Sequence, residues 1–317
     1  MKSVVGHDVS KDSFEVRRTD GKEKQFKNDL SGFKKLLSWA GPAELFVMEA
    51  TGDYHLALAD FLHERGRAVS VVNPQRASYY AKALGIKTKT DKVDARVLCL
   101  YAQCNEVPLY VPDTPAQRRL KKLVRHRQRM VDEAGVEKTI LEEPAPDPFE
   151  ARQCKDRLEF IKAQIKQVER EIQDVIASDE DLTHAFSLLQ TIPGVGKVTA
   201  LTILAEGGDL RRFKSAKAFA KFCGVHPRLR QSGTSVHCTS RMSKCGSAAL
   251  RRCLYMSAVT AIRVEGPCKA LYQRLRVRGM SKKAALGAVM HKQARLAFGV
   301  VRCDRPFSSE RTGLTAA

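Results

Sequence analysis

Four acidic residues in the first third of the chain stand where carboxylates could hold metal ions. Asp91 and Asp94 lie three residues apart in TKTDKVDARVL, and on a helix this spacing puts both carboxylates on one face. Asp8 and Glu49 stand in strand-like contexts, VVGHDVSKD and ELFVMEATGDY. Two-metal phosphoryl transfer needs carboxylates on rigid elements, around hard cations about 3.5–4 Å apart. A fold that gathers these four acids would therefore hold two divalent metals for phosphoryl transfer.

Each acid also has an ordinary structural explanation. Asp91 is placed to cap a helix, and Asp94 to be a solvated carboxylate on that helix. Glu49 favours the metal site, because it stands in the apolar run LFVMEA. Burial is expected there, and a buried carboxylate needs a partner or a metal.

A second reactive group lies in the segment HPRLRQSGTSVHCTSRMSKCGSAALRRCLY, at 226–255. A serine hydroxyl surrounded by Arg and Lys suits attack on a phosphodiester, because the cations neutralise the phosphate and favour the alkoxide. Most serines in loops are helix caps or solvated, so the residues alone leave several candidates open. The candidates are Ser232, Ser235, Ser240, Ser243 and Ser247.

The segment TIPGVGKVTA, at 191–200, predicts a tight hairpin between two helices. Its glycines allow the turn, and its amides can meet a phosphate at the start of the second helix. It resembles a helix-hairpin-helix motif, which holds the nucleic-acid backbone without reading sequence. A plain corner between two helices is the alternative, and Lys197 directly after the turn favours binding.

The charge distribution points to a polyanionic partner. The 317 residues carry a formal net charge of +20, and Leu210 to Val300 hold 20 Lys and Arg but a single acid, Glu265. A basic run is often only a solvated face, but one this lopsided indicates contact with nucleic acid. The nine cysteines form no CxxC pair, and we find no signal peptide or membrane-spanning run. These features indicate reduced thiols in a cytoplasmic protein.

The elements that must position the acids form a mixed sheet with helices on its faces. Three strands of antiparallel type come first, and helix and strand then alternate. The expected strands are Ser3–Val9, Ser13–Arg18, Lys24–Lys27, Glu44–Ala50 and Ala68–Val72. The expected helices follow Asn28 or Asp29, cover Tyr54–Arg65, run from Asn73-Pro74 to Leu84, and run from Asp91 to about Gln103.

Helices dominate the rest of the chain. A basic helix covers Gln117–Met130, and the prolines within Glu142–Phe149 break the helices on either side. An a/d seam then runs from Leu158 to Val175 in steps of three and four. The seam fits either an intramolecular hairpin with the helix at 117–141 or a dimer contact, and we slightly favour assembly. Further helices are expected at about 247–264, 268–277 and 281–299, after a loop at 226–247.

The blocks GHDVSKD, MEATGDYH and VVNPQRASYYAKALGIKTKTDKVDARVL resemble the RuvC-like, RNase H-fold domain of DEDD-type insertion-sequence transposases. These enzymes are also known as bridge-RNA-guided recombinases. The four letters of DEDD fall on Asp8, Glu49, Asp91 and Asp94. His7 departs from the pattern, where an aliphatic residue is expected, and is either an accessory ligand or a tolerated strand residue. The block PRxRQSGTSV…SRMSKCG…LRRxLY resembles the C-terminal transposase domain of the same family, whose catalytic serine aligns with Ser232.

The resemblance covers roughly 1–105 and 185–300, and it implies three regions. These are a RuvC-like catalytic domain at 1–110, a helical or coiled-coil linker at 111–184, and a mainly α transposase domain with the helix-hairpin-helix at 185–317. It implies that the four acids hold Mg²⁺, with Mn²⁺ as the alternative metal, and that Ser232 forms a covalent phosphoserine with DNA. The expected partners are donor and target DNA, a structured bridge RNA and further copies of the chain in a dimer or tetramer, without a membrane. The expected nucleic-acid contacts are Lys197, Arg228, Arg230, Arg241, Lys244, Arg251 and Arg252.

Two other functions remain open from the sequence. A metal-dependent Holliday-junction resolvase would use the same four acids with water as the nucleophile. A non-enzymatic nucleic-acid-binding protein would keep the acids for structure and bind through the hairpin at 191–200. A trapped covalent adduct separates the first from a serine enzyme, and loss of Mg²⁺ dependence would favour the second.

Overall fold

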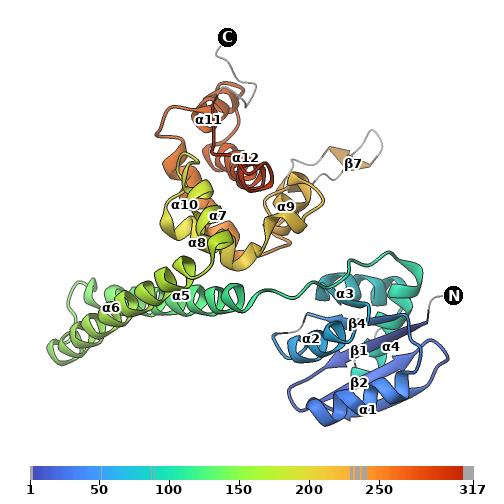
Figure 1. Cartoon of the computed structure of the whole chain (residues 1–317). Coiled ribbons are helices and arrows are strands. Elements are labelled where there is room, and N and C mark those ends of the chain that lie inside the picture. Colours follow the sequence, from blue (N-terminus) through green and yellow to red (C-terminus); the bar gives the residue numbers. More distant parts are fainter. Residues whose placement is uncertain are drawn as a thin grey trace. The chain divides into compact units, whose positions relative to one another are not determined.

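The computed structural model describes residues 3–50, 52–86, 88, 90–228 and 241–309, together with the backbone of 231–232 and 236–237. The chain forms two compact units, Met1–Pro112 and Asp113–Ala317 (Figure 1). We call them the N-terminal unit and the C-terminal unit. The finer division at 110 and 184 stays a prediction.

The N-terminal unit is built on a mixed five-stranded sheet of order β3-β2-β1-β4-β5. Strands β1, β2 and β3 pair antiparallel, whereas β4 runs parallel to β1 and β5 runs parallel to β4. The strands are β1 (Val4–Val9), β2 (Ser13–Arg18), β3 (Glu23–Lys27), β4 (Leu45–Glu49) and β5 (Val69–Val72). The predicted mixed sheet is thus confirmed, and it is consistent with an RNase H-like domain.

Helices cover both faces of this sheet. The four helices are α1 (Leu30–Ala40), α2 (Leu56–Glu64), α3 (Pro74–Ala83) and α4 (Asp91–Cys104). Successive strand residues point to opposite faces. Val5 of β1 therefore packs into a cluster with Leu36 of α1 and Leu58 of α2, whereas Val4 packs into a second cluster with Leu98 of α4. One face of the sheet belongs to α1 and α2, and the other belongs to α3 and α4.

A long helical hairpin opens the C-terminal unit. Helix α5 (Pro115–Leu141) and helix α6 (Pro148–Ala177) both start with proline, and Asp147 caps α6 by accepting from the amides of Phe149 and Glu150. The seam residues Val168 and Ile172 are buried in one cluster with Leu120 and Val124 of α5. The seam therefore packs against α5 within the chain, as the hairpin alternative predicted, and the slightly favoured assembly contact stays a prediction.

The remainder of the C-terminal unit is mainly helical, as predicted. The helices are α7 (Glu180–Gln190), α8 (Lys197–Gly207), α9 (Ala216–Phe222), α10 (Ala248–Ala261), α11 (Pro267–Val277) and α12 (Lys282–Arg302), with a 3-10 turn at Leu210–Arg212. Helix α12 is lined with small and apolar residues such as Val289 and Ala294, which join the main core. Throughout the described ranges, no helix combines the length and apolar character that crossing a membrane requires.

The segment at 226–247 contains strands where we expected a loop. Strand β6 (Pro227–Arg228) pairs with β9 (Arg241–Met242), and β7 (Gln231–Ser232) pairs with β8 (Val236–His237), both antiparallel. The sequence gives no strand signal here, because Ser, Thr and Gly interrupt the alternation of apolar and polar residues that is typical of strands. The two ends of the segment are held together at Gly224 and Gly246, and this contact brings β6 and β9 side by side.

Candidate active site

Parallel pairing of β1 with β4 brings two of the predicted acids side by side. The register matches Gly6 with Val47 and His7 with Met48, so Asp8 and Glu49 come next at the carboxyl ends of the two strands. Alternation puts Asp8 on the same face as Val4, and Glu49 on the same face as Leu45 and Val47. Both acids therefore belong to the face that α3 and α4 cover.

Helix α4 brings Asp91 and Asp94 to the carboxyl ends of these two strands. A Cβ atom on Gly6 would overlap the carbonyl oxygen of Ala95 and lie 2.6 Å from the amide nitrogen of Cys99, so α4 rests directly on β1. Cys99 Sγ also donates to the carbonyl oxygen of Val4 at 3.6 Å. As β1 runs from Val4 to Gly6, its partners on α4 therefore run from Cys99 back towards Ala95. The first turn of α4, with Asp91 and Asp94, consequently lies over the carboxyl end of β1.

Two details of these acids correct the sequence predictions. Thr90 caps α4, since its Oγ1 accepts from the amide of Val93 at 3.3 Å, and Asp91 is instead the first residue of the helix. Asp91 is therefore not needed as the cap. Glu49 is half-buried, not buried, because it is the last residue of β4 and stands where the strand ends.

The four carboxylates share an edge and a face without forming a closed ligand set. Among the residues that the structure describes, no three His, Cys, Asp or Glu side chains are close enough to hold a metal ion. Their chemistry nevertheless fits, because carboxylate oxygens are the donors that hard divalent cations prefer. A bound cation would have to draw the carboxylates nearer to one another.

His7 lies on the opposite face of the sheet from the acids. Its ring is fully buried, with centroids 5.7 Å from the ring of Phe46 and 6.1 Å from that of Phe14, and its Nδ1 is 3.2 Å from the carbonyl oxygen of Val47. Burial lowers the pKa of His7 to about 4, against the opposing effect of hydrogen bonds to the backbone. His7 is therefore a core residue of the strand and not an accessory ligand.

Sequence reasoning missed a fifth carboxylate at this edge, Glu15. It is directly opposite Asp8 in the β1–β2 register. Burial raises the pKa of Glu15; the charge of Lys92 opposes this effect, and the charge of Asp91 adds to it. The signal in the sequence was its alternation with Phe14 and Val16, which puts Glu15 on the face of Asp8.

In the C-terminal unit, Ser232 stands on a hairpin whose base is tightly built. A Cβ atom on Gly246 would overlap the carbonyl oxygen of Phe222 and lie 2.6 Å from the amide nitrogen of Gly224. The amide of Lys244 donates to the carbonyl oxygen of Gly224 at 3.2 Å. The antiparallel pair of β6 and β9 follows and forms the stem of the hairpin. Arg251 fastens the base, since its Nη1 donates to the carbonyl oxygen of Gly246 at 2.8 Å.

The tip of this hairpin carries the predicted nucleophile. The backbone of Ser232 pairs with Val236 in the β7–β8 ladder. The side chain of Ser232 lies outside the described residues, as do Arg230, Ser235 and Ser240.

Two of the other candidate serines have structural roles. Ser247 Oγ caps α10 by accepting from the amide of Leu250 at 3.3 Å. Ser243 Oγ accepts from the amide of Cys245, also at 3.3 Å. These contacts agree with the expectation that most loop serines cap backbone amides.

The predicted cations around this hairpin differ in their contacts. Arg228 and Arg241 are exposed and directly opposite each other in the stem, and Lys244 is exposed with a left-handed backbone (φ 55°). A non-glycine residue in that conformation costs energy and is a mark of functional sites. Arg252, in contrast, is ion-paired with Asp132 of α5 at 2.9 Å.

The turn between α7 and α8 is fixed from inside the unit. Gly194 has φ +86°, and Ser257 Oγ donates to its carbonyl oxygen at 2.8 Å. Gln293 Nε2 reaches the carbonyl oxygen of Pro193 at 3.3 Å. These contacts leave Gly196 and Lys197 exposed at the start of α8.

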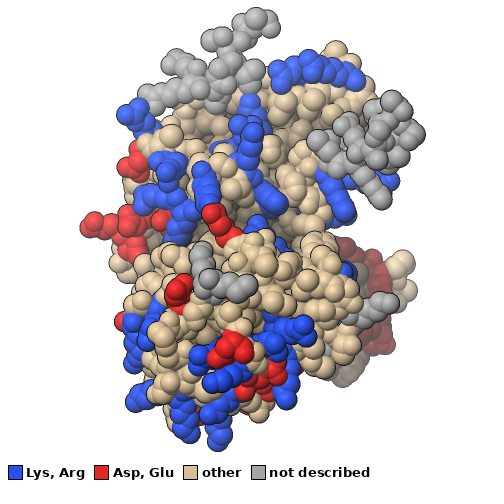
Figure 2. All heavy atoms as spheres, turned by 90° about the vertical axis from the view of Figure 1, so that its right-hand side faces the viewer, with Lys and Arg blue, Asp and Glu red and all other residues tan. Residues whose placement is uncertain are grey.

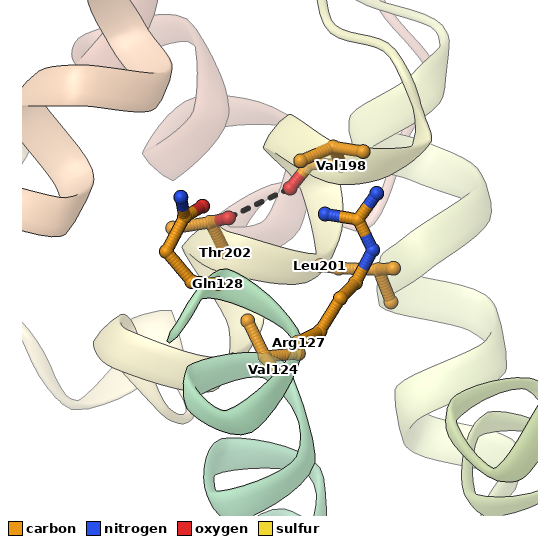
Figure 3. A pocket seen from close by; sticks show the side chains of 6 residues that line it. All are labelled: Val124, Arg127, Gln128, Val198, Leu201 and Thr202. Carbon is orange, nitrogen blue, oxygen red and sulfur yellow. Dashed lines mark hydrogen bonds between the residues drawn. The ribbon is translucent and has the colours of Figure 1, made fainter. Parts of the chain in front are cut away.

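A small pocket adjoins this start of α8. Figure 3 shows Arg127 and Gln128 of α5 reaching towards the first turns of α8. Thr202 Oγ1 donates back to the carbonyl oxygen of Val198 at 2.7 Å, and Arg127 is ion-paired with Glu169 at 2.7 Å. The pocket walls are therefore occupied by contacts within the unit.

Two family models match the chain. A DEDD model described as "Transposase" matches residues 5–143, and a model described as "Transposase IS116/IS110/IS902 family" matches residues 186–273. The pilin gene-inverting protein of Moraxella bovis is 32% identical over 316 residues, which cover 96% of this chain and 98% of that protein. The chain belongs to the IS116/IS110/IS902 family of transposases. It is thus an enzyme that acts on DNA, and its DEDD domain implies a divalent metal.

Further similar proteins bear transposase names. A probable family 20 transposase of Pseudomonas aeruginosa is 28% identical over 300 residues, covering 82% of this chain and 84% of that protein. The transposase for insertion sequence element IS1328 of Yersinia enterocolitica is 23% identical over 286 residues, covering 81% and 83%. The predicted family is therefore confirmed for this transposase.

Proposed function

We propose that this transposase cuts and rejoins DNA through a covalent phosphoserine, with Ser232 as the nucleophile. The observation that carries the proposal is that Asp8 and Glu49 stand at the carboxyl ends of the paired strands β1 and β4, beside the helix α4 whose first turn holds Asp91 and Asp94. The tightly built base of the hairpin that bears Ser232 supports it. Mg²⁺ is the proposed metal, with Mn²⁺ as the alternative.

Each group has a defined part in this reaction. The four carboxylates would hold Mg²⁺, which supplies positive charge to the scissile phosphate. The Ser232 Oγ attacks phosphorus as its hydroxyl gives up a proton, so that an Oγ–P bond forms and the bond from phosphorus to one DNA oxygen breaks; that oxygen takes up a proton and leaves as a DNA hydroxyl. Attack by a hydroxyl of a second DNA end then releases Ser232 and rejoins the strands. The exposed cations Arg228, Arg241 and Lys244 neutralise phosphates around the hairpin.

The partners follow from charge and from the absence of a zinc finger in the sequence. We propose that donor and target DNA bind the basic surface of the C-terminal unit, and that a structured bridge RNA selects the sequences by base pairing. Figure 2 shows Lys and Arg side chains gathered over the face of this unit that is turned to the viewer. The α7–α8 turn would act as a helix-hairpin-helix through Lys197. The chain would work in the cytoplasm as a dimer or tetramer, whose RuvC-like domains supply the carboxylates.

A second product is suggested by the relatives. Two of them, each 32% identical over 316 residues, are named pilin gene-inverting proteins. Cutting and rejoining can invert a segment as well as move one, because the same strand exchange serves both. A substrate with two recombination sites in opposite orientation would reveal inversion directly.

Trapping of the covalent intermediate tests the proposal. Wild-type protein with Mg²⁺ and a DNA substrate should give a denaturant-stable adduct, and digestion should place the phosphate on Ser232. Ser232→Ala should lose the adduct while RNA binding persists, and Ser235→Ala, three residues further along the sequence, is the matched control. An adduct that persists in Ser232→Ala would remove this serine from its role. Cleavage by the wild type without any adduct would favour a resolvase that uses water.

A further inference from the structure

Helix α3 presents an exposed aromatic ring between two cations. Tyr79 is 61% exposed, and Arg76 and Lys82 stand three residues before and after it, on the same face of the helix. The ammonium nitrogen of Lys82 is 6.0 Å from the centroid of the Tyr79 ring. The neighbouring Tyr80 instead packs against Tyr101 of α4, with ring centroids 5.4 Å apart. The core of the unit therefore uses Tyr80 and leaves the ring of Tyr79 in solvent.

This face begins at the edge of the sheet that carries the acids. Strand β5 ends at Val72, which the register pairs with Glu49, and Asn73 caps α3 directly afterwards. Ala77 of α3 joins the same buried cluster as Leu98 of α4, so the two helices lie side by side. Both helices start at the carboxyl ends of the parallel strands.

The surrounding sequence attracts anions. No Asp or Glu occurs from Arg65 to Thr90, and this stretch ends where Asp91 begins. Its six cations are Arg65, Arg67, Arg76, Lys82, Lys87 and Lys89. A phosphate backbone is therefore drawn along α3 up to the carboxylates that would hold the metal.

We propose that Arg76, Tyr79 and Lys82 form a platform for an unpaired stretch of the DNA strand delivered to the carboxylates. A base stacks on the ring of Tyr79, and the flanking phosphates contact Arg76 and Lys82. Single-stranded nucleic acid is bound elsewhere by this combination of aromatic rings and positive charge. Duplex DNA keeps its bases stacked inside, so only an unpaired base can reach the ring. This inference rests on the proposed function, since it names the strand that the same site receives.

Photocrosslinking of the full-length protein tests the platform locally, because the basic C-terminal unit also binds nucleic acid. The probe is a single-stranded oligodeoxynucleotide with 5-iododeoxyuridine, irradiated in EDTA so that no cleavage occurs. The crosslinked peptide should contain Tyr79. Tyr79→Leu should lower the yield of this peptide roughly ten-fold, the order expected for one lost stacking contact, and Tyr79→Trp should restore it. Tyr255→Leu, at another exposed tyrosine (43%), is the control and should leave the yield at Tyr79 unchanged.

Further variants and probes in the same crosslinking assay distinguish this platform from other modes of nucleic-acid binding. Arg76→Ala and Lys82→Ala should each lower the yield and weaken its salt dependence, since each removes one phosphate contact. A matching duplex should not crosslink at Tyr79, and equal crosslinking by the duplex would overturn the proposal. Crosslinking by an iodouridine RNA alone would overturn it in favour of RNA binding, and absence of any Tyr79 peptide would overturn it outright. Because the assay needs neither metal nor Ser232, its failure is distinguishable from failure of the phosphoserine mechanism.

Discussion

At the scale of single residues, Thr90 and Asp91 divide two tasks that one residue was expected to perform. Thr90 caps α4 through its hydroxyl, so the Asp91 carboxylate is available for a ligand. Thr90→Ala should lower the free energy of unfolding by about 1 kcal/mol, the usual value of a cap, and leave metal-dependent cleavage measurable. Asp91→Asn should abolish cleavage and change stability by less than about 1 kcal/mol, the most that a charge near a helix start usually contributes.

Denaturant unfolding and strand cleavage are measured on both Thr90→Ala and Asp91→Asn. Thr90→Ala should lower stability and keep cleavage, whereas Asp91→Asn should keep stability and lose cleavage. The wild type and Asp94→Asn serve as references for the same helix turn. Full cleavage by Asp91→Asn would remove Asp91 from the metal site. A large loss of stability in the same variant would mean that its role is structural.

The residues of the site were predictable to different degrees. The four acids could be found because their spacing, apolar surroundings and family resemblance agree. Glu15 could not, since it is an ordinary acid on an alternating strand until the register puts it opposite Asp8. The role of Ser243 likewise depends on the amide of Cys245, whose position only the folded hairpin defines. Ser247, in contrast, is an ordinary N-cap directly before α10.

At the scale of elements, the contact between β1 and α4 positions the candidate site. Gly6 makes this contact close, because any side chain there would overlap the backbone of α4. Gly6→Ala should therefore push α4 away from β1. We expect a loss of about 1–3 kcal/mol in the free energy of unfolding, as in other overpacked cores, and a fall in cleavage as Asp91 and Asp94 shift.

A glycine in an open position gives the matched control for Gly6→Ala. Gly299 lies within α12, and a Cβ atom there would meet nothing within 4 Å. Gly299→Ala should raise stability by about 0.5–1 kcal/mol through helix propensity alone and leave cleavage unchanged. Thermal or denaturant unfolding compares the two, and a neutral Gly6→Ala would show that α4 is not fixed by this contact.

Local patterns predicted the elements well and their partners less well. The strand from Ser13 to Arg18 was found with its observed ends, and each other strand end in this sheet lies within one residue of its prediction. The seam from Leu158 to Val175 was found too, but periodicity cannot say which helix fills it. The β6–β9 stem was missed because it depends on the approach of Gly224 to Gly246, which are far apart for a local pattern.

At the scale of the whole molecule, charge is separated from the candidate metal ligands. The segment from Leu210 to Val300, within the C-terminal unit, holds 20 Lys and Arg against one acid, and the chain as a whole carries +20. The rest of the chain is therefore nearly neutral. The proposed division of labour follows: the C-terminal unit supplies most of the charge that binds the polyanion, and the N-terminal unit supplies the carboxylates that would hold the metal. Composition predicted this division before any fold was known, because net charge reports on partners and not on topology.

The salt dependence of DNA binding tests how that charge is used. Each phosphate contact contributes about 0.9 to the slope of log affinity against log salt concentration. Arg241→Gln should lower the slope by about one such contact, since Arg241 is exposed on the hairpin stem. Arg252→Gln should lower it less, because the Arg252 guanidinium is already held by Asp132 and would have to leave that ion pair to reach a phosphate. Fluorescence anisotropy between about 50 and 200 mM salt, the range in which such contacts change affinity most visibly, measures both slopes. Equal slopes for the two variants would mean that the ion pair with Asp132 opens when DNA binds.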